Sequence, residues 1–250
     1  YQKVDDMIMQ KEMSHNRKWP IALITDSTCD LPQDILEKYQ ITMVPLTLQF
    51  GASLFLDRTT IANEQFYNQL ESSPQYPTTS QPAYKDFINK YSYLSSHYNS
   101  TIGIHLSKAF SGTFSNSQRA AKAVREQSGK NISVINSSRI SSALGLTVLR
   151  AAEAIEQGQS HQQIVSAVES WNDKNHILVS AKTVKYLVKS GRLSHSKGVI
   201  GKLLGVKPII SVDNQGKAIT FGKAFSEKGS MNQLIKVASE LVEKGKIWGY

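Results

Sequence analysis

Short apolar runs alternate with longer amphipathic segments through residues 21–174. Ile21–Thr25 has the length and branched content typical of a buried strand. Similar strands are predicted at 41–50, 100–106 and 132–135, and helices at 30–39, 61–72, 81–94, 113–127, 142–157 and 160–174. This alternation predicts parallel βαβ units, so the loops that follow the strands should meet at one edge of a sheet. Open α/β sheets bind their ligands at that edge.

The pattern changes after residue 176. Strands are predicted at 177–180, 206–212 and 218–221, the last two joined by a tight turn at Asp213–Gly216, and helices at 183–190 and 230–243. We therefore expect an extension at 1–20 (poorly ordered or a short helix near 4–13), an α/β domain at 21–172 and a smaller mixed-sheet α/β domain at 173–250. Residues 246–250 resemble the opening of a strand, so we expect further chain after Tyr250.

Composition narrows the class of protein. The chain has 250 residues, a net charge of +9, 40% hydrophobic and 20% charged residues, which is ordinary for a globular protein. No run reaches the ~18 apolar residues of a membrane helix, and the N-terminus lacks the apolar segment of a secretory signal. The single cysteine, Cys29, excludes an internal disulfide and a multi-cysteine zinc site, and it fits a cytoplasmic protein.

Small hydroxyl side chains gather in four loops, each just before a predicted helix: 27–28, 78–80, 111–113 and 137–138. Helix N-termini carry unpaired N–H groups and partial positive charge, so several of them together would form an uncharged cradle for a carboxylate or phosphate. Serine and threonine are also the preferred helix caps, so a single such loop is more simply explained as a cap. Asp30 is expected to cap the helix at 30–39.

Signatures of catalysis are mostly missing. The chain has no Gly-x-Ser-x-Gly elbow, no Gly-Lys-Ser/Thr phosphate loop and no histidine pair with zinc spacing. His105 ends a predicted strand beside Ser107 and Ser111, and as their general base it would indicate a hydrolase. A packed core histidine is the simpler interpretation. Asp26 could orient a nucleophile for a phosphotransferase, bind a metal or accept loop N–H bonds; we favour the last role.

A basic run without acidic residues occupies 182–207. It could bind nucleic acid, but Tyr186 is its only aromatic residue, so it lacks a platform for stacking bases. A solvated face is the simpler interpretation, with partner docking or transient membrane-surface contact as the alternatives. We expect no nucleic-acid partner.

Five motifs occur in an order that resembles the DegV family of bacterial fatty-acid-binding proteins. They are Ile24-Thr-Asp-Ser-Thr-Cys-Asp-Leu-Pro32, Val44-Pro-Leu46, Thr79-Ser-Gln-Pro82, His105-Leu-Ser107 with Ser111-Gly-Thr113, and Ser190-Gly-Arg-Leu-Ser194. The resemblance covers about residues 21–250. It implies two α/β domains, the first a three-layer parallel-sheet domain, with one long-chain, palmitate-like fatty acid buried between them.

The resemblance also implies a lipid carrier without its own catalysis or cofactor, which in some members presents the fatty acid to a separate kinase. Carried over by motif, the carboxylate would meet the hydroxyls of Thr79 and Ser111. The neighbours of that site would be Ser80, Gly112, Thr113, Asp26, Ser27 and Thr28. Arg192 and Lys197 would belong to a surface that docks the partner. No metal site is implied.

The sequence departs from the family pattern in three places. Phe225 stands where some members bring an arginine to the head group, and Asn136-Ser137 replaces the usual Asp-Ser. A His-x-Gly-x-Gly segment near the family's C-terminus is not found here. For the acyl tail we expect contacts from Phe110, Phe114, Ile140 and Leu144.

Overall fold

A four-stranded parallel sheet forms the centre of the protein. The computed structural model describes residues 17–73, 75–193 and 206–243. The sheet has the order β2 (Thr42–Val44), β1 (Ile21–Asp26), β6 (Ser100–His105) and β7 (Asn131–Asn136). Every residue of β1 and β6 is buried, as expected for central strands covered on both faces.

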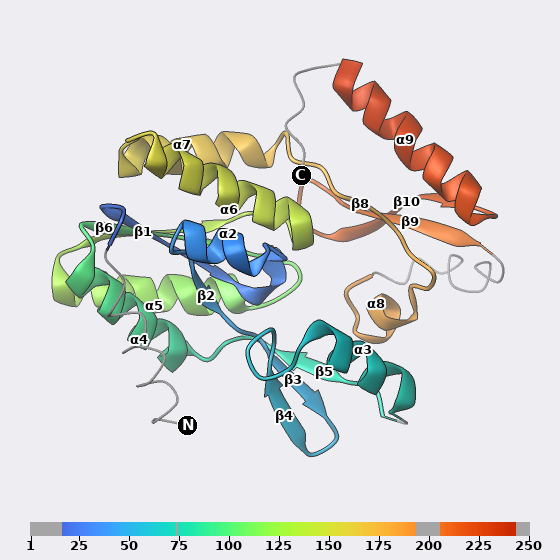
Figure 1. The fold of residues 1–250 in the computed structure, drawn as a ribbon, viewed down its shortest axis with the longest axis horizontal. Coiled ribbons are helices and arrows are strands. Elements are labelled where there is room, and N and C mark those ends of the chain that lie inside the picture. The colour runs from blue at the N-terminus through green and yellow to red at the C-terminus, as the bar shows by residue number, and fades with distance from the viewer. Residues whose placement is uncertain (1–16, 74, 194–205, 244–250) are drawn as a thin grey trace.

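Helices cover both faces of this sheet (Figure 1). Alternate residues of β1 point to opposite faces: Ile21 and Leu23 pack in one apolar cluster, and Ala22 and Ile24 pack in another. The first cluster includes side chains of α2 (Gln33–Lys38), α6 (Ser141–Glu156) and α7 (His161–Asn172), and the second those of α4 (Tyr84–His97) and α5 (Thr113–Ser128). The predicted three-layer α/β fold is confirmed.

A second, small sheet of three strands follows β2 of the parallel sheet in the chain. The single strand predicted at 41–50 is two strands, because the chain leaves the parallel sheet at Pro45 and continues as β3 (Thr47–Phe50). That strand pairs antiparallel with β4 (Ser53–Leu56) and with β5 (Thr78–Ser80). The helix α3 (Asn63–Ser72) packs on them through Phe66, whose ring centroid lies 5.7 Å from that of Phe50. The prediction of a loop through 78–80 was therefore wrong.

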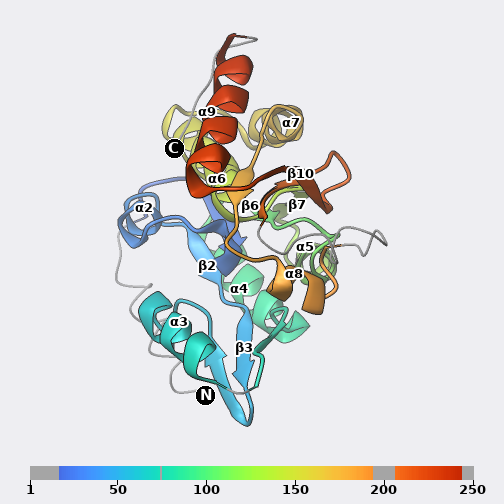
Figure 2. The ribbon, with the colours of Figure 1, turned by 90° about the vertical axis from the view of Figure 1, so that its right-hand side faces the viewer.

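The C-terminal part is built on an antiparallel sheet with the order β10 (Ala218–Ala224), β9 (Lys207–Val212) and β8 (Leu178–Ser180). The long helix α9 (Glu227–Glu243) lies along it, tied to β8 by a 2.7 Å hydrogen bond between the hydroxyls of Ser180 and Ser230. The short helix α8 (Lys185–Lys189) lies between this sheet and the small one (Figures 1 and 2). The predicted domain boundary at 172/173 follows the end of α7 and stays a prediction.

The segment between β1 and α2 differs from the prediction in two details. Asp30 does not cap α2: the helix begins after Pro32, and Asp30 adopts a left-handed conformation with its carboxylate accepting a 2.6 Å bond from the Ser141 hydroxyl. A one-turn 3-10 helix at Ser27–Cys29 occupies the place of the expected loop. The helix predicted near 4–13 and the strand at 246–250 lie outside the described residues. Within the described ranges, no helix combines the length and apolarity needed to cross a bilayer.

Candidate functional site

The loops after β1, β6 and β7 meet at the carboxyl edge of the parallel sheet, as the pattern predicted. The Asp26 carboxylate at the end of β1 accepts a 3.0 Å bond from the Leu106 amide after β6. The Ser107 amide donates to the Arg139 carbonyl after β7 at 2.8 Å. Three hydroxyl-bearing loops are thereby held together by hydrogen bonds between them.

Ser111 is a half-buried residue that stands just before α5. Its Oγ accepts a 3.2 Å bond from the Thr113 amide and lies 2.9 Å from the Thr113 hydroxyl. Thr113 is fully buried, whereas Ser111 and Gly112 are half-buried. Ser111 therefore presents its hydroxyl beside the free N–H groups of the first turn of α5, which is a favourable place for an anion.

The segment Thr79–Pro82 reaches the same helix end from the small sheet. Thr79 and Ser80 are exposed at the end of β5. A Cβ atom placed on Gly112 would lie 2.2 Å from Gln81 Oε1, so the Gln81 side chain rests directly on this glycine. The Asn116 side-chain amide donates to the Pro82 carbonyl at 3.0 Å. The structure therefore brings together the segment Thr79–Pro82 and the loop that carries Ser111.

Sequence reasoning did not single out Gln81. Its place in the Thr-Ser-Gln-Pro motif was the signal in the sequence that could have pointed to it. Only the fold shows that the Gln81 side chain packs on Gly112, where a larger residue would collide with it. Gly112 has an ordinary φ of −78°, so space and not backbone freedom explains the glycine.

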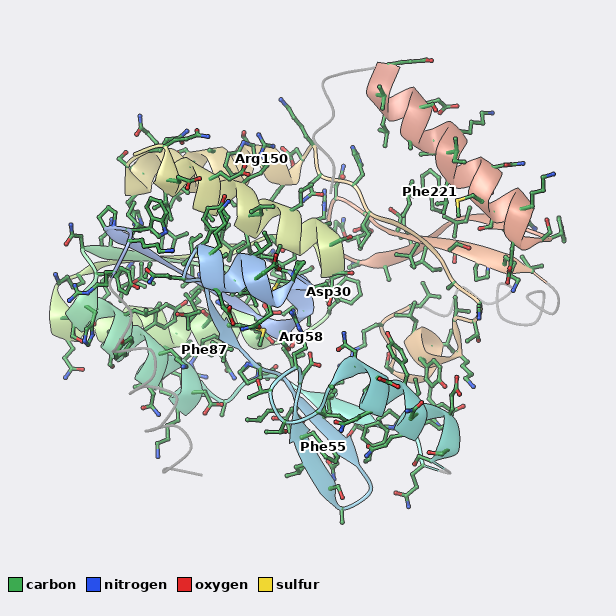
Figure 3. All side chains as sticks on the ribbon, viewed as in Figure 1. Asp30, Phe55, Arg58, Phe87, Arg150 and Phe221 are labelled. Atoms are coloured by element: carbon green, nitrogen blue, oxygen red, sulfur yellow. The ribbon has the colours of Figure 1, made fainter. Side chains whose placement is uncertain are left out.

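Asp26, Ser27 and Thr28 border the site, but their polar atoms are already engaged. Thr28 donates from its hydroxyl to Asp26 Oδ1 at 2.6 Å and from its amide at 3.2 Å. The buried Ser27 hydroxyl accepts from the Leu46 amide at 3.1 Å and bonds to the Asp57 carboxyl. Burial raises the pKa of Asp57, and the Ser27 bond partly opposes that shift. Asp30 and Arg58 lie close by at this edge, in different loops (Figure 3).

His105 does not pair with Ser107 or Ser111, which corrects the hydrolase arrangement that the sequence left open. Its ring is fully buried, with Nδ1 3.1 Å from Asp26 Oδ2 and Nε2 2.8 Å from the Ser117 hydroxyl. The Ser107 hydroxyl instead donates to the Gly216 carbonyl at 2.8 Å. The imidazole therefore bonds to α5 through Ser117 and not through Ser111, and sequence reasoning missed Ser117 as its partner.

The C-terminal sheet docks on this edge through the turn between β9 and β10. Gly216 lies against Ser107 and Ser138, so that an added Cβ would come within 2.1 Å of Ser107 Oγ. Arg139, only 3% exposed, donates to the carbonyls of Asn172, Asn175 (2.6 Å) and Asp213 (3.4 Å). Burial lowers the pKa of its guanidinium, opposed by Asp173 and Asp213. Arg139 is a second residue that the sequence analysis missed.

Arg192 lies beside the loop that carries Ser111. Its Nε donates to the Phe110 carbonyl at 3.4 Å, and Phe110 packs against the apolar clusters of both the first domain and the C-terminal part. Of the expected tail contacts, Leu144 is fully buried, and Phe110, Phe114 and Ile140 are half-buried. Lys197 lies outside the described residues.

A small open pocket of about 200 Å³ lies elsewhere, between the β3–β4 hairpin and the end of α3. Its lining includes Phe50, Phe55 and Gln69 and none of the predicted site residues. Across 17–73, 75–193 and 206–243, no three His, Cys, Asp or Glu side chains are grouped so as to hold a metal ion.

A three-layer part built on a parallel sheet, joined to a part built on an antiparallel sheet, defines a class of two-part α/β protein. The chain belongs to the DegV family, whose model, described as "Uncharacterised protein, DegV family", matches residues 20–248. It is 35% identical over 225 residues to a DegV domain-containing protein of Staphylococcus aureus, covering 89% of this chain and 77% of the relative.

Solved structures share the fold. A DegV family protein from Thermus thermophilus, reported for its fatty acid binding, is 30% identical with a TM-score of 0.81 over 90% of this chain and 78% of its own. DegV of Bacillus subtilis, reported as a fatty acid binding protein, is 31% identical with a TM-score of 0.80 over 91% and 79%. A stearic-acid-binding protein from Eubacterium ventriosum is 25% identical with a TM-score of 0.83 over 90% and 78%.

Proposed function

We propose that this protein binds a long-chain fatty acid, with its carboxylate held by the hydroxyls of Thr79 and Ser111. The observation that carries the proposal is the meeting of the Thr79–Pro82 segment with the N-terminus of α5, where Gln81 rests on Gly112 and Asn116 binds Pro82. Similarity over most of the chain to structures reported as fatty-acid-binding proteins supports it.

The physical chemistry of such a ligand suits an uncharged head-group site. A ~16-carbon tail buries ~14 methylenes at ~0.8 kcal/mol each, about 11 kcal/mol before association costs of several kcal/mol. The tail therefore provides most of the affinity. The head group needs only partners for its oxygens, since an unpaired buried acceptor costs about 1–3 kcal/mol and more when charged. Two hydroxyls and the N–H groups at the start of α5 meet that need.

We further propose a carrier that presents its fatty acid to a separate kinase in the cytoplasm. The exposed Arg192, next to the Ser111 loop, supports a docking surface at this place, to which we assign Lys197 as well. A palmitate-like chain in contact with Phe110, Phe114, Ile140 and Leu144 is part of the same proposal. The clustering of Phe110 with both apolar cores supports a tail running between the two parts.

Native mass spectrometry and titration with stearate and palmitate test the proposal. Protein purified from cells should carry a co-purified acyl chain. Thr79→Ala and Ser111→Ala should each weaken binding by about tenfold, the effect of ~1.4 kcal/mol. A chain that purifies without lipid and binds neither fatty acid would refute the proposal.

The chain offers matched controls for both substitutions. Thr78 is the exposed neighbour of Thr79 on β5, and successive strand residues point to opposite faces. Ser115 is an exposed serine of α5 near Ser111. Thr78→Ala and Ser115→Ala should leave the dissociation constant within twofold of the unmodified protein. Equal losses in the control and test variants would show that the two hydroxyls hold no carboxylate.

A further inference from the structure

One imidazole ring connects both ends of the loop that carries Ser111. His105 is the last residue of β6, and its Nε2 lies 2.8 Å from the hydroxyl of Ser117, twelve residues later in α5. Its Nδ1 lies 3.1 Å from Asp26 Oδ2, and the same carboxylate oxygen accepts the Leu106 amide at 3.0 Å. The segment 106–116 is thus fastened at its start and at its end. We call Asp26, His105 and Ser117 the His105 staple.

The staple is built to be rigid. All three side chains are fully buried, and Asp26 accepts two further bonds from Thr28. The bonds are satisfied together when Asp26 is a carboxylate that accepts Nδ1–H, and Nε2 accepts the Ser117 hydroxyl proton. Because an unpaired buried polar atom is costly, the loss of one member leaves its partner in an unfavourable state. Each member therefore holds the others in one arrangement.

The route from the staple to the site is short. Ser117 follows Thr113 by four residues, so the two lie one above the other on the same face of α5. Thr113 is fully buried and contacts the Ser111 hydroxyl through both its amide and its own hydroxyl. Fixing Ser117 against β6 therefore fixes the first turn of α5 and the direction of the Ser111 hydroxyl.

The order Asp–His–Ser is that of a hydrolase triad, but the burial argues against catalysis. Ser117 is fully buried and its Oγ lies 2.7 Å from the hydroxyl of Tyr91, on the neighbouring helix α4. No substrate reaches an atom enclosed in this way. A role in positioning fits the same contacts.

We propose that Asp26, His105 and Ser117 are positioning residues that set the affinity of the Ser111 loop for a carboxylate. This inference rests on the proposed function. It assigns the buried polar network a role in ligand recognition, exerted through Ser111 and without contact with the ligand.

A double-mutant cycle for stearate binding tests the inference. Ser117→Ala should weaken binding about fivefold in the unmodified protein but less than twofold when Ser111 is already alanine, because the two residues act as a unit. A structural loss unrelated to Ser111 would weaken binding equally in both backgrounds and would overturn the inference. If Ser117→Ala fails to fold, Asp26→Asn, which keeps the side-chain shape, replaces it in the same cycle.

Tyr91→Phe is the matched control. It removes a hydroxyl that bonds to the same Ser117 oxygen, but this hydroxyl belongs to α4 and not to the segment 106–116. Its midpoint of thermal unfolding should fall about as much as that of Ser117→Ala, with the stearate affinity within twofold of the unmodified protein. Equal losses of affinity in both variants would also overturn the inference.

The same data separate this inference from the proposed function. An unmodified protein that binds no fatty acid refutes both. Suppose instead that the protein binds stearate, that Ser111→Ala weakens binding, and that the effect of Ser117→Ala simply adds to it. This result refutes the positioning role of the His105 staple and leaves the proposed function standing.

Discussion

Polar side chains at the carboxyl edge of the sheet fall into two groups. Asp26, Ser27 and Ser107 are buried with their hydrogen bonds already made inside the protein. Thr79 and Ser111 are exposed or half-exposed beside the end of a helix. The first group builds the edge, and the second leaves hydroxyls accessible to a ligand. This division, at the scale of single residues, is why motif residues that stand together in sequence have different roles.

Cys29 gives the first prediction at this scale. Its side chain is fully buried, and burial raises the pKa of the thiol to about 11. The thiolate is the reactive form, so we expect almost no modification of the native protein by Ellman's reagent at pH 8 and complete modification in urea. Labelling of the native state as fast as that of the unfolded state would contradict this prediction.

Asp57 gives the second prediction at the scale of single residues. Burial raises the pKa of its carboxyl above the value in the unfolded chain, so the folded state binds more protons over that range. The contribution of this group to stability is greatest at low pH and is lost as the pH rises through the raised pKa. We expect Asp57→Asn to increase the free energy of unfolding more at pH 7 than at pH 4, measured in urea. An equal change at both pH values would contradict it.

At the scale of elements, the sequence predicted the parallel sheet well because short apolar stretches alternate with helical segments, and its two central strands, β1 and β6, are buried throughout. It missed β4, where Ser53 and Leu54 are exposed, and β5, the run Thr78–Ser80, which is exposed throughout. Both strands are held by antiparallel pairing with β3, β4 through the hairpin at Gly51 and β5 on the other side of β3. The convergence of hydroxyl loops was predictable from topology. The contacts of Gln81, Arg139 and Ser117 were not, because each depends on how side chains of different elements pack against one another.

The contact between β5 and α5 gives an element-scale prediction. Gly112→Ala places a methyl group where Gln81 lies, and Gln81 is an exposed side chain that can move. We expect a loss of stability below about 1 kcal/mol, since the φ of −78° suits alanine, together with an approximately fivefold weaker binding of stearate. Calorimetry of binding and urea unfolding measure the two effects.

The double variant Gln81→Ala/Gly112→Ala is the control. Removing the glutamine side chain makes room for the methyl group, so binding should recover toward that of Gln81→Ala alone. If the double variant binds as weakly as the sum of the single effects predicts, the displaced side chain is not the cause.

At the scale of the whole molecule, the two parts are joined through the turn at Asp213–Gly216. Gly216 has a φ of +77° and fits so closely that an added Cβ would lie 2.1 Å from Ser107 Oγ and 3.3 Å from the Ser138 Cα. Gly158 has nearly the same φ, +78°, but nothing within 4 Å of an added Cβ. An alanine at either position would therefore suffer the same backbone strain. Only at Gly216 would its side chain also collide with the neighbouring part of the protein.

Comparing Gly216→Ala with Gly158→Ala separates these two effects. Gly158→Ala should lower the free energy of unfolding by about 1–2 kcal/mol, because alanine is strained in the left-handed conformation. Gly216→Ala carries the same backbone cost and must also break the buried Ser107–Gly216 hydrogen bond, worth about 1 kcal/mol, and separate the packed surfaces. We expect its loss in urea unfolding to exceed that of Gly158→Ala by at least 1 kcal/mol, and stearate affinity to fall only in Gly216→Ala, because the ligand is proposed to lie between the parts that the turn joins. Equal stability and equal affinity in the two variants would show that this turn does not hold the parts together.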